Sequence, residues 1–172
     1  MIIVGTGAVG KSAITIQFTQ NIFDRQETYD PTIEDAYYCK RMIDGVGVEL
    51  EIVDTAGQDD YIALRDTWMK SCYGFILVFD LTSYRTLEEL KIFVEQIKRT
   101  KLDENKPLSN GNIFPGIILG NKCDLNFELS EKDVASFMKQ ELDIQVPILF
   151  TSAKTRVNID EAFETVIREM RN

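Results

Sequence analysis

Eight residues near the amino terminus constrain the fold of this 172-residue chain more than any other feature. The segment Gly5–Ser12 reads GTGAVGKS and matches the pattern G-x-x-x-x-G-K-[ST]. It follows the apolar run Met1–Val4 and precedes a stretch with helical spacing, so it joins a predicted strand to a predicted helix. Glycines let successive backbone N–H groups converge on phosphate oxygens, and the helix amino terminus adds partial positive charge. The motif therefore predicts a phosphate-binding loop.

Two side chains of this loop carry specific chemistry. We expect Lys11 to reach the β- and γ-phosphates of a nucleoside triphosphate, and the Ser12 hydroxyl to ligate Mg²⁺. The predicted phosphate-binding residues are Gly7, Ala8, Val9, Gly10, Lys11, Ser12 and Ala13. The alternative is a glycine-rich turn whose lysine merely faces solvent, and the motif alone leaves that alternative open.

A second motif bears on the choice between ATP and GTP. The residues NKCD at 121–124 follow the buried apolar run Ile117–Leu119. The Asp124 carboxylate can accept hydrogen bonds from guanine N1–H and the 2-amino group, and adenine has neither donor at that edge. Each lost charge-assisted hydrogen bond costs about 1.5–3 kcal/mol, so the motif favours GTP. The alternative is a polar loop at the end of a strand.

A third motif, DTAGQ at 54–58, ends the alternating strand predicted at Val48–Val53. Asp54 can hold Mg²⁺ directly or through water, and the Gly57 N–H can approach a γ-phosphate closely. Gln58 can position a water molecule for in-line attack. The alternative is a capping aspartate followed by a turn glycine.

The remaining sequence alternates short apolar runs with helical periodicity, which predicts an α/β fold with a mainly parallel sheet. The run Phe75–Phe79, like Ile117–Leu119, is typical of parallel strands covered on both faces. Helical spacing recurs at Ile14, Phe18 and Ile22, at Leu87, Leu90, Val94 and Ile97, at Val134, Phe137, Met138 and Leu142, and at Ile159, Phe163, Val166, Ile167 and Met170.

Three further features predict a turn, a helix start and a loop within this pattern. The loop Asp44–Gly47 predicts a hairpin between a strand at Tyr37–Ile43 and the strand after it. Ser130 and Asp133 could start the helix that carries Val134. The polar stretch Lys101–Phe114 predicts a surface loop.

The composition excludes several classes of protein. Without histidine the chain cannot hold a Ser-His-Asp or Cys-His catalytic pair or a histidine-ligated zinc. The net charge of −9 argues against nucleic-acid binding, which needs clustered Lys and Arg. Cys39, Cys72 and Cys123 are odd in number and lack metal-ligand spacing, which is typical of a reduced intracellular chain.

No membrane-spanning run, signal peptide or lipidation site is recognisable in the sequence. We therefore expect a cytoplasmic protein. It would bind the cytoplasmic face of a membrane only if the native chain carries a lipidated tail that this sequence lacks.

Together the motifs resemble those of Ras-like small GTPases. GTGAVGKS, YDPTIEDAYY at 29–38, DTAGQDDY at 54–61, NKCD and TSAK at 151–154 occur in the order and spacing of that family, over essentially the whole chain. The segment 29–38 is similar to the Ras and Rap branch. The resemblance implies the P-loop NTPase fold, with a six-stranded sheet, one antiparallel edge strand and helices on both faces.

The resemblance also implies one G domain over residues 1–172. Its parts would be the P-loop at 5–12, switch I at 29–37, switch II at 57–68 and an extended surface loop at 101–114. Ala8 and the longer approach to switch I at Asp24–Thr28 depart from the common Ras pattern.

Further residue roles rest on the resemblance alone. Phe23 would pack against the guanine, the Lys122 stem would cover its other side, and Thr32 would ligate Mg²⁺ and sense the γ-phosphate. The implied catalytic residues are Lys11, Thr32, Gly57 and Gln58. The implied Mg²⁺ ligands are Ser12, Thr32 and, through water, Asp54. Beyond the phosphate-binding loop, the implied nucleotide-binding residues are Phe23, Tyr29, Thr32, Gly57, Asn121, Lys122, Asp124, Ser152, Ala153 and Lys154.

The function implied is a switch that binds GTP or GDP with Mg²⁺ and hydrolyses GTP slowly. Effector proteins would bind switch I (Tyr29–Tyr37), with Glu34 and Asp35 facing the effector. A GTPase-activating protein would supply an arginine, because Arg25, Arg41, Arg65 and Arg85 show no sign of acting in cis. A guanine-nucleotide exchange factor would reload the switch. The alternatives are a GTP-binding scaffold with negligible hydrolysis and a P-loop nucleotide kinase.

Overall fold

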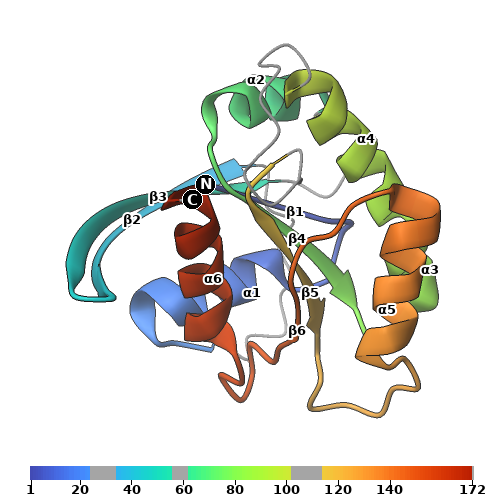
Figure 1. The fold of residues 1–172 in the computed structure, drawn as a ribbon. Helices are drawn as coiled ribbons and strands as arrows, with labels where there is room; N and C mark the ends of the chain where they lie inside the picture. Colours follow the sequence, from blue (N-terminus) through green and yellow to red (C-terminus); the bar gives the residue numbers. More distant parts are fainter. Residues whose placement is uncertain (24–33, 56–61, 102–113, 172) are drawn as a thin grey trace.

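The fold is built on one six-stranded sheet with the strand order β2-β3-β1-β4-β5-β6. The computed structural model describes residues 1–23, 34–55, 62–101 and 114–171 (Figure 1). The strands are β1 (Ile2–Val4), β2 (Glu34–Ile43), β3 (Val46–Thr55), β4 (Phe75–Asp80), β5 (Gly116–Asn121) and β6 (Ile148–Phe150). All neighbouring pairs are parallel except β2 and β3, so β2 is the antiparallel edge strand that was predicted.

Helices cover both faces of the sheet, as the fold class requires. Figure 1 shows α1 and α6 together on one face, and α2, α3, α4 and α5 on the other. The helices are α1 (Lys11–Gln20), α2 (Ile62–Ser71), α3 (Tyr84–Glu88), α4 (Leu90–Lys101), α5 (Glu131–Phe137), the π-helical turn η3 (Met138–Leu142) and α6 (Ile159–Arg171). Among the described residues, none of these helices has both the length and the apolar character needed to span a membrane.

Each face has its own apolar core. On the face covered by α1 and α6, the ring of Phe18 in α1 stacks on the ring of Phe163 in α6, with centroids 3.9 Å apart. On the other face, Phe75 meets Phe114 edge to face at 5.3 Å. Every residue of β4 and β5 is buried, which confirms that their apolar runs are strands covered on both sides.

The predicted apolar face of the first helix extends too far. The helix α1 ends at Gln20, where Asn21 adopts a left-handed conformation (φ 58°) and its N–H donates to the Gln17 carbonyl at 3.1 Å. This C-cap stops the helix two residues before Ile22. Ile22, predicted on the buried face, is 52% exposed.

Other boundaries also differ from the predicted ones. The hairpin turn is only Asp44-Gly45, with φ of 52° and 77°, and Val46 and Gly47 belong to β3. A two-residue turn with both φ values positive matches the strand twist, which explains the shorter loop. Leu87 and Leu90 keep helical spacing but lie on two helices, α3 and α4, separated at Glu89.

The ends of the predicted surface loop belong to ordered elements. Lys101 is the last residue of α4, and Phe114 is buried in the core. Residues 102–113 lie outside the described part. The helix start at Ser130 and Asp133 is confirmed, because the two residues form a reciprocal capping box at the start of α5.

Candidate nucleotide-binding site

The candidate segments meet at one edge of the sheet. Gly5 follows β1, Asp54 lies near the end of β3, Asn121 ends β5, and Thr151 follows β6. These strands are parallel, so their carboxyl ends share that edge. Ligands of open α/β sheets bind in the crevice outside the carboxyl ends of the strands. The fold therefore brings together motifs that are distant in the sequence.

Lys11 is held over the phosphate-binding loop. It is the first residue of α1 and is 7% exposed. Its Nζ donates to the carbonyl oxygens of Gly5 at 2.9 Å and Thr6 at 2.8 Å. Burial lowers the pKa of Lys11 to about 8, against the opposing effect of Asp54. A buried ammonium in this position is suited to an anionic ligand, since phosphate oxygens can replace its lost hydration.

Gly10 and Gly7 play different parts in the phosphate-binding loop. Gly10 has φ 101°, and a Cβ there would lie 2.2 Å from the Asn121 Nδ2 atom. Only glycine therefore lets the loop approach the NKCD segment so closely. At Gly7 a Cβ would meet no atom of the described residues within 4 Å.

Ser12 and Asp54, the two predicted Mg²⁺ ligands in the described residues, are in contact. The Ser12 hydroxyl donates a short hydrogen bond to Asp54 Oδ2. Asp54 is fully buried, and its Oδ1 atom has no hydrogen-bond partner among the described residues. Burial raises the pKa of Asp54 to about 6, although the Ser12 hydrogen bond and Lys11 act in the opposite direction. One hydroxyl and a buried carboxylate with a spare oxygen fit Mg²⁺.

Asn121 links the three parts of the site. Its Nδ2 donates to the Val9 carbonyl in the phosphate-binding loop at 2.9 Å. Its Oδ1 accepts from the Thr151 hydroxyl and the Ala153 N–H, each at 3.3 Å. Because Asn121 is 2% exposed, these bonds are shielded from water. The NKCD segment, the TSAK segment and the phosphate-binding loop thus form one hydrogen-bonded unit.

Asp124 lies beside the residues expected to complete the base site. Its Oδ1 accepts from the Ser152 hydroxyl at 2.6 Å, and its Oδ2 is 3.9 Å from Lys154 Nζ. The Ser152 oxygen in turn accepts from the Thr155 N–H at 3.1 Å. The carboxylate is oriented by neighbours and keeps acceptor capacity for a ligand.

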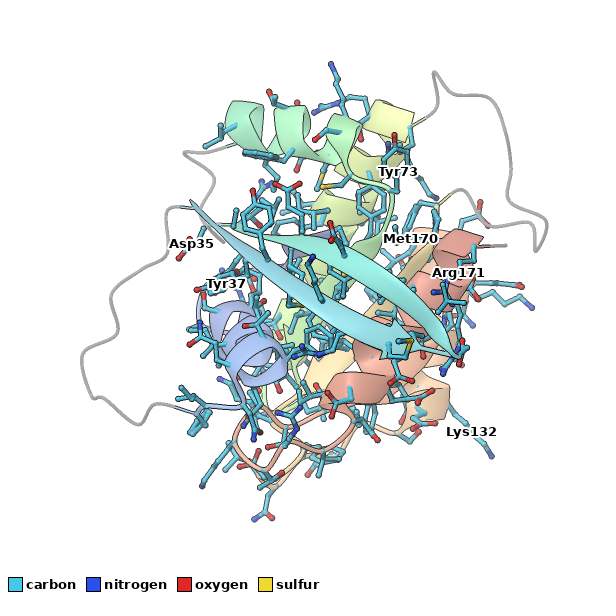
Figure 2. All side chains as sticks on the ribbon, turned by 90° about the vertical axis from the view of Figure 1, so that its left-hand side faces the viewer. Asp35, Tyr37, Tyr73, Lys132, Met170 and Arg171 are labelled. Atoms are coloured by element: carbon cyan, nitrogen blue, oxygen red, sulfur yellow. The ribbon has the colours of Figure 1, made fainter. Side chains whose placement is uncertain are left out.

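The start of β2 borders the same edge of the sheet. Asp35 pairs in register with Asp54 across the antiparallel ladder. Figure 2 shows Asp35 and Tyr37 near the same end of the β2 ribbon. The pKa of Tyr37 is raised to about 12, mainly by burial and further by the negative charges of Asp35 and Asp54. This end of β2 therefore carries concentrated negative charge.

Three residues that were not predicted contact the site, Gln17 and Asp80 directly and Arg156 through Gln17. The Gln17 Nε2 atom donates to the Ala153 carbonyl at 2.7 Å. Arg156 donates to the Gln17 carbonyl and to Asn21 Oδ1, each at 2.6 Å. Asp80, the last residue of β4, forms a 2.5 Å ion pair with Lys122. The only signal for Asp80 was its place at the end of the buried run Phe75–Phe79, and the other two belong to no motif.

Four predicted site residues, Tyr29, Thr32, Gly57 and Gln58, lie outside the described residues. Phe23 lies three residues beyond the end of α1 and is 36% exposed.

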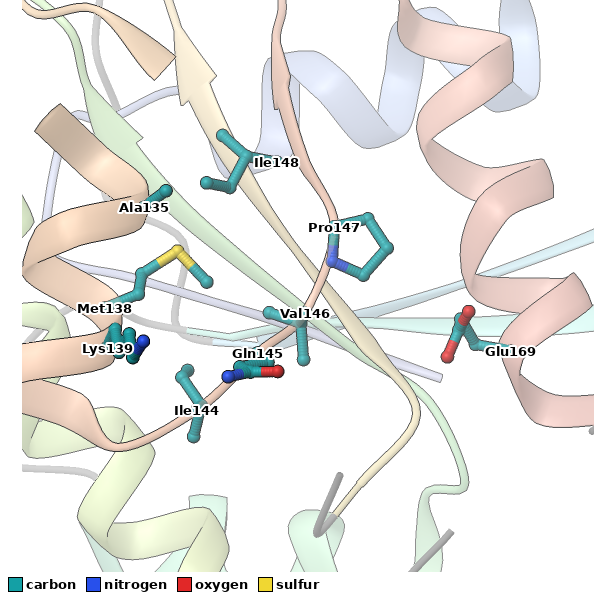
Figure 3. Close-up of a pocket in the computed structure, with 9 residues that line it drawn as sticks. All are labelled: Ala135, Met138, Lys139, Ile144, Gln145, Val146, Pro147, Ile148 and Glu169. Carbon is teal, nitrogen blue, oxygen red and sulfur yellow. The ribbon is translucent and has the colours of Figure 1, made fainter. Parts of the chain in front are cut away.

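A separate groove lies beside the amino end of β6, the edge strand on the other side of the sheet from β2. It has a volume of about 510 Å³ and is lined by Met138, Ile144, Val146 and Ile148, among others (Figure 3). None of its lining residues is a predicted site residue. The groove borders the amino end of β6, whereas the motifs lie at the carboxyl ends of the strands.

Comparisons with known proteins identify the family of this chain. The sequence model of the Ras family matches residues 1–172. The chain is 44% identical over 173 residues to "Ras-like protein rasB" of Dictyostelium discoideum, covering 99% of this chain and 81% of that protein. A match of this extent excludes a nucleotide kinase. Proteins of this family act with effectors, GTPase-activating proteins and exchange factors. The chain therefore belongs to the Ras family, and it is a small GTPase that binds GTP and GDP with Mg²⁺ and hydrolyses GTP.

Proposed function

We propose that the residues assembled around Asn121 form the guanine-nucleotide site of this GTPase switch. The observation that carries the proposal is the set of hydrogen bonds from one buried amide to Val9, Thr151 and Ala153. Those bonds hold the phosphate-binding and base-binding segments in a fixed relation. A ligand that spans both segments must carry phosphates at one end and a base at the other.

At the phosphate end, residues 7–13 supply backbone N–H groups and Lys11 supplies a charge. The first N–H groups of an α-helix have no acceptor within the helix, which suits the start of α1 to phosphate oxygens. Ser12, Asp54 and Thr32 would hold Mg²⁺, Asp54 through water. When bound, the ion neutralises charge that builds on the phosphate oxygens.

At the base end, Asp124 would accept from guanine N1–H and the 2-amino group. Phe23 and the stem of Lys122 would cover the two faces of the base, with Ser152, Ala153 and Lys154 completing the site. The fixed orientation of the Asp124 carboxylate beside Ser152 supports this assignment. Adenine would be disfavoured, because it lacks both donors and would leave the desolvated Asp124 carboxylate without partners.

For hydrolysis we propose that Gln58 orients the attacking water. The Gly57 N–H and Thr32 would respond to the γ-phosphate, and Lys11 would stabilise charge on it. Switch I at 29–37 and switch II at 57–68 would then differ between the GTP and GDP states.

A partner protein would supply the arginine that accelerates hydrolysis. Of the four arginines considered above, the structure describes Arg41, Arg65 and Arg85, and each of them contacts another protein group. Arg41 donates to the Phe18 carbonyl at 2.7 Å, Arg65 to Gln96 at 2.8 Å, and Arg85 pairs with Glu89 at 2.7 Å. These contacts support an arginine supplied in trans by a GTPase-activating protein.

Effectors would bind switch I, residues Tyr29–Tyr37. The acidic end of β2 at Asp35 favours an effector that offers basic side chains along its own strand edge. The three cysteines are free thiols, which fits an intracellular protein.

The base assignment can be tested with the substitution Asp124→Asn. An amide in this position cannot accept from two donors as a carboxylate does, but its NH₂ can donate to the 2-oxo group of xanthine. We expect Asp124→Asn to bind GTP at least about a hundredfold more weakly and to prefer XTP, since two hydrogen bonds are changed. Competition against a fluorescent nucleotide measures both affinities.

The matched control is Asp143→Asn, on an exposed left-handed residue after η3 where asparagine is equally suitable. It should leave the order GTP over XTP and ATP unchanged. An Asp124→Asn protein that still prefers GTP would refute the assignment.

A further inference from the structure

Asp80 ends β4 directly beside the base-binding segment. It pairs in register with Asn121, the last residue of β5. A backbone hydrogen bond also joins the two strand ends, because the Leu81 N–H donates to the Asn121 carbonyl at 3.0 Å. Asp80 is 8% exposed, so its carboxylate is largely shielded from solvent.

The carboxylate of Asp80 is held from two sides. Oδ1 accepts from the Thr82 N–H at 2.9 Å and from the Thr82 hydroxyl at 2.7 Å. The Asp80 N–H donates to the Thr86 hydroxyl at 2.9 Å, which ties this residue to α3. Oδ2 faces Lys122 Nζ at 2.5 Å. The acid is therefore a fixed anchor, and the lysine is the group that it positions.

Lys122 needs such an anchor. Its backbone has φ 70°, a left-handed conformation that is uncommon outside glycine. Its side chain is 33% exposed. A lysine side chain has several rotatable bonds, and they stay mobile when the ammonium is in contact with water alone. The ion pair holds the ammonium against the end of β4 and stretches the aliphatic stem between the two strand ends.

We propose that Asp80 is a positioning residue for the guanine site, acting through Lys122. The inference rests on the proposed function, in which the Lys122 stem covers one face of the base. By neutralising the ammonium and fixing its place, Asp80 makes the stem a preformed apolar surface. The nucleotide then does not have to order this side chain when it binds.

The experiment measures the dissociation rate of a fluorescent GDP from four proteins in Mg²⁺. These are the wild type, the single variants Asp80→Asn and Lys122→Met, and the double variant. Lys122→Met keeps the stem of the side chain but removes its charge. Asp80→Asn keeps an oxygen for Thr82, so the turn is preserved. We expect each single variant to release GDP roughly threefold to tenfold faster, the range for a partly buried ion pair. The double variant should be no faster than the single ones, because both substitutions remove the same interaction.

Two further proteins separate the possible failures. Lys122→Ala removes the stem and should release GDP faster than Lys122→Met. If it releases GDP at the wild-type rate, the base-covering role in the proposed function is wrong. If it is fast but Asp80→Asn matches the wild type, or if the Asp80→Asn and Lys122→Met effects multiply, the positioning role of Asp80 is overturned. Glu89→Gln, in an exposed pair with Arg85 nearby in the sequence, is the control and should leave the rate unchanged.

Discussion

Lys11 shows how much of the site depends on the placement of a single charge. The ammonium is buried against two backbone carbonyls, and its negative neighbour Asp54 is paired with Ser12. Its pKa is lowered to about 8 because burial outweighs the attraction of Asp54. The protein therefore maintains a poorly solvated cation where phosphate is expected to bind.

That burial predicts a pH dependence of stability in the nucleotide-free protein. The unfolded chain keeps Lys11 protonated up to about pH 10.5, whereas the folded chain releases the proton near pH 8. The unfolded state therefore binds more protons between these values, and the free energy of unfolding rises with pH in that window. The gain is at most about 3 kcal/mol, from 1.36 kcal/mol per pKa unit.

Urea unfolding of the wild type and Lys11→Met at several pH values between 7 and 10.5 isolates this effect. The wild type should gain stability relative to the variant as the pH rises above 8. A difference in stability that stays constant over this range would contradict the buried, desolvated state of Lys11.

At the scale of elements, the sheet followed from the sequence more completely than the helix boundaries did. Apolar runs located β1, β4 and β5 because buried parallel strands leave little room for polar residues. The three-residue strand β6 was expected only through the resemblance, since Ile148–Phe150 is too short for periodicity. The end of α1 was missed because Asn21, not glycine, supplies the left-handed cap.

The motifs did not predict that α1 contacts the segment 151–158. Gln17 is 5% exposed and donates to the Ala153 carbonyl, while Arg156 joins the same helix end. Gln17→Ala would leave a buried carbonyl without its donor, at a cost of about 1–3 kcal/mol. We expect GDP release to accelerate about tenfold as the base-binding segment loosens.

Stopped-flow displacement of fluorescent GDP measures this change. Thr19→Ser is the control, since among the described residues the Thr19 hydroxyl bonds within α1, to the Thr15 carbonyl, and serine keeps that bond. If Gln17→Ala released GDP at the wild-type rate, α1 would not support the base site.

Helix α2 is tied to α4 by polar contacts. Arg65 donates to Gln96, Gln96 donates to Asp66, and Arg99 pairs with Asp66 at 2.8 Å. Trp68, on the same helix, packs partly buried against the core. A switch II that changes with the nucleotide must alter the surroundings of this helix.

We therefore predict different Trp68 fluorescence in the GDP state and in a state with a non-hydrolysable GTP analogue. It is the only tryptophan of the chain, so emission reports one position. Trp68→Phe supplies the background from tyrosine. Identical spectra in the two states would count against a switch II that reaches residue 68.

At the scale of the whole molecule, the net charge of −9 does not oppose binding of a polyanion. The phosphates would meet a local arrangement of helix N–H groups, Lys11 and Mg²⁺, and screening weakens charges more than about 10 Å away. The acidic surface bears on the proposed effector contact at the end of β2, where we expect Asp35 to favour a partner with basic side chains.

The candidate site divides into parts that sequence could and could not reveal. Residues such as Lys11 and Asp124 were predicted because nucleotide chemistry demands those side chains at fixed spacings. Asp80, Gln17 and Arg156 were missed because they act on other protein groups. Their positions depend on how strands and helices meet, as in the register of Asp80 with Asn121.

The central claim is that this chain is a slow GTPase switch whose hydrolysis depends on Gln58 and on a partner's arginine. Single-turnover phosphate release from preloaded GTP tests it, with and without a GTPase-activating protein for Ras-family members, on the wild type and Gln58→Leu. We predict slow release alone, strong acceleration by the activating protein, and loss of at least about a hundredfold of the accelerated rate in Gln58→Leu, with GTP affinity retained. No acceleration of the wild type, or equal accelerated rates for the two proteins, would contradict the claim.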